Sequence, residues 1–292
     1  MQFFKVFIIT FYTVFGSIYC SNSINNNNLF QKLTVHAFDS TNVSNKISIS
    51  DTILKDIKSI GSDFLLMYSS PLRFTSSDWL ITGGVIITDV SSMYLLDEIM
   101  SKKFLEGHNG TKDKINEFGN YFGSTIPNLI VSGGVYLSGL IFNSYKLRTS
   151  GLHVFQASLY SGLLNIILKG VIGRERPYGG EGPFIFQPFS SDNKFNSHPS
   201  GHSTMAFALA SSLSCEIDNT FATILLYSAA TLTMGSRIYS NMHWFSDTFF
   251  GAVIGSAFGY GVYYLNDIPK PLGISQLQVY PKFNGIGMSY NF

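Results

Sequence analysis

Three short runs in the second half of the chain hold the residues best suited to chemistry. They are Lys169 to Arg176-Pro177, then Pro199-Ser200-Gly201-His202, then Ser236-Arg237 with His243 and Asp247. Together they supply three cations, two histidines, one carboxylate and a glycine at a turn. This set of groups could hold a tetrahedral oxyanion, attack it and protonate the group that leaves.

The second run predicts an anion site at the start of a helix. Ser200 and Gly201 precede an apolar helical segment, so the free N–H groups of its first turn, together with the helix dipole, favour a bound anion. The cations Lys169, Arg176 and Arg237 add charge-assisted donors suited to phosphate oxygens. Three unpaired cations at the end of an apolar bundle would be costly without an anionic ligand.

The two histidines fit different tasks. His243 and Asp247 are four residues apart on a predicted helix and so share a face. A carboxylate there can accept from one ring nitrogen and leave the other as a lone pair for attack. His202 is then available to donate a proton. His198 is also four residues from His202, but Pro-Ser-Gly between them breaks the helix that a zinc-binding pair requires, so no metal site is predicted.

This constellation resembles the signature of the type 2 phosphatidic acid phosphatase superfamily. That signature reads K-x6-R-P, then P-S-G-H, then S-R-x5-H-x3-D, and every position of it is present here. The superfamily includes lipid phosphatases, class A acid phosphatases and vanadium-dependent haloperoxidases. The resemblance covers roughly residues 75–266.

The resemblance implies a reaction and a role for each residue. His243 would attack phosphorus in line and form a phosphohistidine, Asp247 would orient His243, and His202 would protonate the leaving alkoxide and then activate water. The phosphoryl oxygens would be held by five groups: Lys169, Arg176, Ser200, the Gly201 N–H and Arg237. No metal and no cofactor is expected. A neutral His243 and a protonated His202 predict a bell-shaped pH profile.

Composition narrows the class of protein. Hydrophobic residues make up 45% of the 292 residues and charged residues only 13%, about half of the usual charged share of a soluble domain. The net charge of +1 leaves no broad basic face, which argues against a nucleic-acid partner. Only Cys20 and Cys215 are present, so removal of the N-terminal segment would exclude an intrachain disulfide.

The chain divides into five predicted parts. Residues 1–22 indicate a signal peptide or a retained N-terminal anchor, and residues 23–50 an Asn- and Ser-rich lead-in. Residues 51–74 predict an amphipathic helix that either packs on the core or lies at a membrane surface. Residues 75–266 form the phosphatidic acid phosphatase-like helical domain. Residues 267–292 predict a β-hairpin tail, with Asn284-Gly285 as its turn.

The predicted fold is all-α, a helical bundle of about six core helices followed by that short hairpin. Apolar helical patterns occur at 78–100, 114–124, 127–143, 151–170, 203–216, 221–239 and 244–265. The Gly- and Pro-rich stretch 177–198 predicts a long loop, of the kind that is often a functional lid. Antiparallel neighbours joined by short loops would bring the three runs to one end of the bundle.

We therefore predict an exported phosphatase of the cell envelope, membrane-associated or periplasmic. Few charges and apolar helices favour a membrane enzyme acting on a lipid phosphate or prenyl (pyro)phosphate. Alternatives are a soluble periplasmic acid phosphatase of broad specificity, which would act on small phosphoesters, a vanadium-dependent haloperoxidase, and a non-enzymatic lipid-binding protein.

Overall fold

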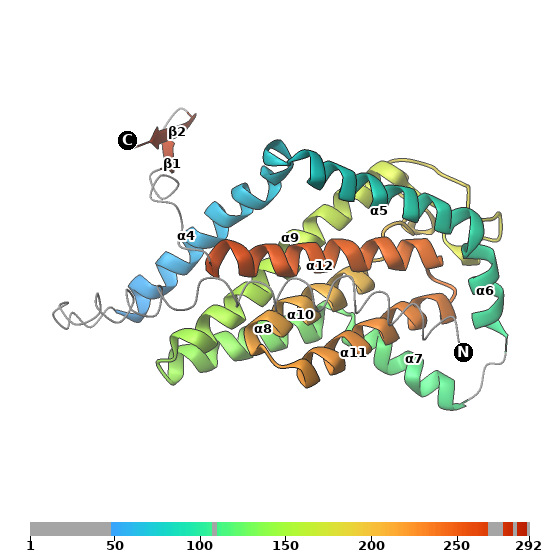
Figure 1. Cartoon of the computed structure of the whole chain (residues 1–292), viewed down its shortest axis with the longest axis horizontal. Helices are drawn as coiled ribbons and strands as arrows, with labels where there is room; N and C mark the ends of the chain where they lie inside the picture. Colours follow the sequence, from blue (N-terminus) through green and yellow to red (C-terminus); the bar gives the residue numbers. More distant parts are fainter. Residues whose placement is uncertain (1–47, 107–109, 268–276, 283–284, 291–292) are drawn as a thin grey trace.

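The computed structural model describes residues 48–106, 110–267, 277–282 and 285–290, so the predicted leader and most of the lead-in lie outside it (Figure 1). This part of the chain contains nine α-helices. They are α4 (Ile49–Tyr68), α5 (Ser76–Leu95), α6 (Asp97–Leu105), α7 (Gly110–Phe122), α8 (Thr125–Ile141), α9 (Tyr145–Ile172), α10 (Gly201–Ile217), α11 (Thr220–Tyr239) and α12 (Phe245–Asp267).

Helices α9, α10 and α12 form the centre of the bundle. Helix α10 packs on α12, α11 and α9, while α8 packs on α9 and α7 packs on α11. The all-α class is therefore confirmed for the helical part of the chain. Beyond it, β1 (Leu277–Lys282) and β2 (Gly285–Tyr290) pair antiparallel. The predicted short C-terminal hairpin is not part of this confirmation and stays a prediction.

Glycines on one face of α12 allow it to lie directly against α10. Gly251, Gly255 and Gly259 are spaced four apart, as residues on one helix face are. A Cβ atom at Gly251 would lie 2.5 Å from the Ser200 carbonyl oxygen, and one at Gly255 would lie 2.8 Å from the Ala208 nitrogen. Small residues thus bring the first turns of α10 and α12 together, as in tightly packed apolar bundles.

The predicted continuous helix over 78–100 is wrong, because the chain breaks at Leu96. Helices α5 and α6 meet there at 55°. The break places Asp97 in the first turn of α6, where its carboxylate accepts from the Ser246 backbone N–H at 2.8 Å. A contact inside the bundle therefore overrides the helical pattern of the sequence.

Helix α4 packs on the core through residues of its second half. The Tyr68 hydroxyl donates to the Tyr160 carbonyl oxygen, and the Tyr160 hydroxyl donates to the Ile60 carbonyl oxygen, both at 2.7 Å. The Phe64 ring packs edge-on against Tyr160 at 5.6 Å. The helical unit therefore begins before residue 75.

Several helices have the length and composition of membrane spans. Helices α9 and α12 are each long and apolar enough to cross a bilayer, and the bent pairs α5–α6 and α7–α8 would raise the number of candidate spans to four. Large apolar side chains remain exposed on these helices, among them Leu80 and Ile141, both 77% exposed. Exposed apolar surface of this extent is typical of a protein in contact with lipid.

Candidate active site

The three sequence runs lie together at one end of the bundle, as predicted. The end of α9, the loop 173–200, the start of α10, the end of α11 and the start of α12 meet there, with α6 beside them (Figure 1). One backbone contact joins the second run to the third, and another lies within the third run. The Ser200 N–H donates to the Asp247 carbonyl oxygen at 2.9 Å, and the His243 N–H donates to the Arg237 carbonyl oxygen at 3.3 Å.

Local sequence explains why the helices end and begin here. Gly173 has φ of +60° and closes α9 in the left-handed conformation that favours glycine. Ser200 is the N-cap of α10, and its hydroxyl accepts from the Ser203 N–H. Asp247 is the third residue of α12 and accepts from the Trp244 N–H at 2.8 Å, so this carboxylate also caps its own helix.

The three predicted cations lie close together, and no acidic residue in the described part of the chain pairs with them. The Lys169 ammonium group donates to the Asn196 carbonyl oxygen at 2.5 Å, and Arg176 Nη2 donates to the same oxygen at 3.4 Å. Within the described residues none of the three forms an ion pair, and the Nε atoms of Arg176 and Arg237 are buried without a hydrogen-bond partner. Buried donors without acceptors are rare, so these groups are suited to an anionic ligand.

Burial and the neighbouring positive charges lower the pKa of Arg237 and of His202. Burial, followed by the charge of Arg176, lowers the pKa of Arg237 to about 10. His202 lies partly exposed in the first turn of α10, where burial and then Arg237, Lys169 and Arg176 lower its pKa to about 4. At pH 7 the His202 ring is therefore neutral, and a bound anion would be needed to raise its pKa.

His243 lies buried between the cations and Asp247. Burial lowers the pKa of the His243 ring well below its usual value, although Asp247 opposes this effect. The ring nitrogen Nδ1 lies 3.7 Å from Asp247 Oδ2, which is longer than a hydrogen bond. The direct bond between these two side chains that the sequence predicted is therefore not formed.

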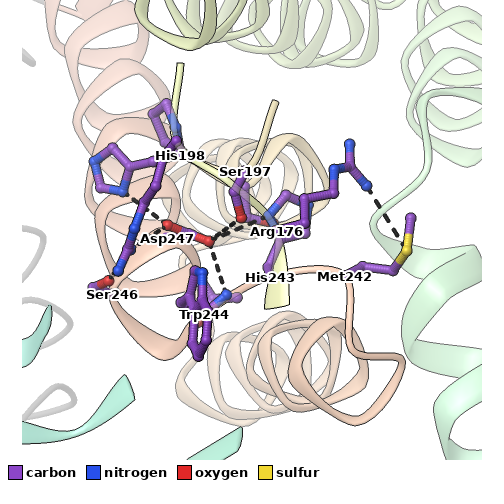
Figure 2. Close-up of polar contacts among 12 residues, drawn as sticks. Arg176, Ser197, His198, Met242, His243, Trp244, Ser246 and Asp247 are labelled. Carbon is purple, nitrogen blue, oxygen red and sulfur yellow. Dashed lines mark hydrogen bonds and ion pairs between the residues drawn. The ribbon is translucent and has the colours of Figure 1, made fainter. Parts of the chain in front are cut away.

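Asp247 is instead held by four other donors (Figure 2). Its Oδ2 accepts from the Ser197 hydroxyl at 2.5 Å and from the Trp244 N–H at 2.8 Å. Its Oδ1 accepts from Arg174 Nη1 at 2.7 Å and lies 3.1 Å from His198 Nδ1. The carboxylate is thereby fixed in place, facing His243 without being bonded to it.

Sequence reasoning missed Arg174 and Asn120 as parts of the site. Arg174 is fully buried and also donates to Asp97 at 2.7 Å. Asn120 on α7 accepts from Arg237 Nη1 at 2.6 Å and from the Ser236 hydroxyl at 3.2 Å. Arg174 is two residues before Arg176, which was a visible signal, but its partner Asp97 is 77 residues away.

The His198 ring interacts with two carboxylates. The His198 ring lies between Asp247 and Asp89, and it stacks on Phe250 with the ring centroids 5.1 Å apart. Over the part of the chain that the structure describes, no three His, Cys, Asp or Glu side chains converge as metal ligands would.

Comparison with known proteins locates the matching region in the same helices. Residues 151–268 match the family model of the PAP2 superfamily. A lipid A 1-phosphatase of Rhizobium johnstonii is 34% identical over 110 residues, which is 37% of this chain and 44% of that protein. A lipid A 1-phosphatase of Rhizobium etli is also 34% identical over 110 residues, or 37% of this chain and 47% of that protein. The match thus spans less than half the length of these relatives.

Two solved structures are also similar. The crystal structure of Aquifex aeolicus LpxE shares 23% identity, with a TM-score of 0.44 over 58% of this chain and 95% of the other. A transmembrane PAP2 type phosphatidylglycerolphosphate phosphatase from Bacillus subtilis shares 21% identity, with a TM-score of 0.47 over 73% of this chain and 96% of the other.

Proposed function

We propose that the chain, whose residues 151–268 match the family model of the PAP2 superfamily, is a metal-independent phosphatase that hydrolyses a lipid phosphate or a prenyl (pyro)phosphate at the cell envelope. One observation supports this most directly. Lys169, Arg176 and Arg237 converge beside the first turn of α10, next to the buried ring of His243, and no carboxylate among the residues that the structure describes pairs with them. A phosphate group fits the charge and the donors of that arrangement.

His243 is the proposed nucleophile. Its Nδ1 faces Asp247, which leaves Nε2 as the nitrogen with a free lone pair for attack on phosphorus. The pKa of the ring is lowered, so the ring is unprotonated at neutral pH, as a nucleophile must be. The new N–P bond forms as the bond from phosphorus to the lipid oxygen breaks, and Asp247 stabilises the positive charge that develops on His243.

His202 is the proposed proton donor. Its low pKa without an anion means that it must gain a proton as the phosphate binds. The added negative charge offsets Arg237, Lys169 and Arg176, and the protonated ring then gives its proton to the leaving alkoxide. In the second step the neutral ring accepts a proton from water, which attacks the phosphohistidine and releases phosphate.

The exposed apolar helices favour a lipid substrate over a small soluble one. The candidate spans α9 and α12 both have one end at the site, through Lys169 on α9 and Asp247 on α12. A phosphate at this end of the bundle would therefore lie near the level of lipid headgroups. The predicted leader favours a location in the cell envelope.

The test is phosphate release from phosphatidic acid, prenyl pyrophosphate and p-nitrophenyl phosphate in detergent micelles with EDTA. We expect wild type to be active on the lipid substrates and His243→Ala to be inactive. His153→Ala is the matched control, since His153 is also buried and paired, with Glu216, but lies sixteen residues before Lys169 on α9, about 24 Å away. Loss of all activity with EDTA, or normal activity of His243→Ala, would refute the proposal.

A further inference from the structure

We propose that His198 and Asp89 form a positioning pair that holds Asp247 and sets the basicity of His243. This inference rests on the proposed function, because its readout is the hydrolytic rate. Neither residue belongs to the signature of the family, and neither is among the groups proposed to touch the phosphate.

The geometry joins two carboxylates from different helices through one imidazole. The His198 ring is 2% exposed; its Nδ1 lies 3.1 Å from Asp247 Oδ1 on α12, and its Nε2 lies 3.4 Å from Asp89 Oδ2 on α5. Phe250 stacks on the ring with an interplanar angle of 20°, which fixes the plane of the imidazole. Asp247 is thus connected to α5 through a rigid, buried link.

The charges require a proton within this link. A carboxylate only accepts hydrogen bonds, so a ring that lies between two carboxylates is fully satisfied only as an imidazolium, or when one of the acids is protonated. Asp89 is 5% exposed, and its Oδ1 has no hydrogen-bond partner among the described residues. His198 is therefore the group that compensates the negative charge of the buried Asp89 carboxylate.

The link reaches His243 through the second oxygen of Asp247. Donors on Oδ1 withdraw charge from the carboxylate whose Oδ2 faces His243 Nδ1 at 3.7 Å. Removing the His198 donor would leave Asp247 more negative and raise the pKa of His243, whereas removing the charge of Asp89 would lower it. The other charged groups around the two rings remain in place in both variants: Arg174, Asp97, Lys169 and Arg237.

The experiment compares His198→Phe with Asp89→Asn in full-length protein. Phenylalanine keeps the ring that stacks on Phe250 and removes both nitrogens, so we expect kcat to fall roughly tenfold, the loss expected for one hydrogen bond to a charged group. We expect KM to change less than about twofold, since the phosphate contacts are untouched. The acid limb of kcat/KM should move to higher pH in His198→Phe and to lower pH in Asp89→Asn, which keeps an oxygen that can accept from the ring.

Opposite shifts of the acid limb are the decisive result, because a merely structural role would not produce them. His153→Phe is the matched control: it removes a buried histidine from its carboxylate partner Glu216 and should leave the pH profile unchanged. An unchanged kcat and acid limb in His198→Phe would overturn the inference. If His198→Phe does not fold, the test rests on Asp89→Asn. An acid limb of kcat/KM that does not move to lower pH in this variant would then overturn the inference. Failure of the proposed function is distinct, since wild type would then release no phosphate.

Discussion

Replacing Arg174 with glutamine should destabilise the whole bundle. The Arg174 side chain has no exposed surface and donates at 2.7 Å to both Asp97 and Asp247, neither of which is exposed. Its remaining donors bond the Ser246 hydroxyl at 2.7 Å and the Pro183 carbonyl oxygen at 2.9 Å. A glutamine cannot reach all of these acceptors and cannot neutralise either carboxylate.

The size of the effect follows from the groups left behind. Breaking a buried ion pair by removing one partner costs about 3–5 kcal/mol. Two carboxylates share the Arg174 cation, but Asp97 keeps its bonds from Ser246, and Asp247 keeps those from Ser197 and Trp244. We therefore expect a loss near the middle of that range, about 4 kcal/mol, and a fall in melting temperature of roughly 10 °C.

The assay is thermal unfolding of the detergent-solubilised protein, followed by circular dichroism. Lys102→Gln is the matched control, because Lys102 pairs with Glu98 on α6 at 3.4 Å but its side chain is 74% exposed, and no measurable change is expected. Adding Asp97→Asn to Arg174→Gln removes one of the two carboxylate charges that are left without a cation. The double variant should therefore regain part of the lost stability. An Arg174→Gln variant that melts within about 2 °C of wild type would refute the reasoning, since it would mean that the two carboxylates need no cation.

Three further predictions test the packing and the charges of the site. Gly255→Ala places a Cβ 2.8 Å from the Ala208 nitrogen and should cost about 1–3 kcal/mol by thermal unfolding, whereas Gly134→Ala, with open space around it, should not destabilise. Arg237→Gln should raise the free energy of unfolding without phosphate by about 1 kcal/mol, and it should abolish the stabilisation by added phosphate that we expect for wild type. Because the pKa of His202 is about 4 without an anion, kcat/KM should fall as pH rises above that value. In the complex with substrate this pKa should be higher, so kcat should begin to fall only at a higher pH. If kcat and kcat/KM fell at the same pH, His202 would not be the acid.

The assembly of the signature residues could be predicted because it depends on helix direction alone. Two antiparallel helices joined by a turn, α10 and α11, must return Arg237 to the end of the bundle where Ser200 lies, whatever the details of packing. Capping chemistry then fixes the boundaries nearest to the site, such as Gly173 after α9 and Ser200 before α10. These are local effects, and local effects are visible in a sequence.

The partners of Asp247 could not be predicted, because they depend on how distant segments pack. Asp97 and Ser246 are 149 residues apart, and their contact coincides with the break between α5 and α6. The sequence there still shows a continuous helical pattern. Likewise, nothing near His198 in the chain indicates that Asp89 lies opposite its ring. Buried polar contacts of this kind follow from the tertiary fold and not from periodicity.

The two charged regions of the site explain why it can bind an anion while containing three buried carboxylates. Asp89 pairs with His198, and Asp97 and Asp247 pair with Arg174. The negative charges of these carboxylates are therefore compensated within the protein. The cations on the other side of His243 have no such partners among the described residues, and their charges add to burial in lowering the pKa of His202. A phosphate therefore completes the charge balance only on the cationic side. The bound phosphate also raises the pKa of His202, so the ring can take up a proton. Binding of the anion and protonation of the acid are therefore coupled through the same charge.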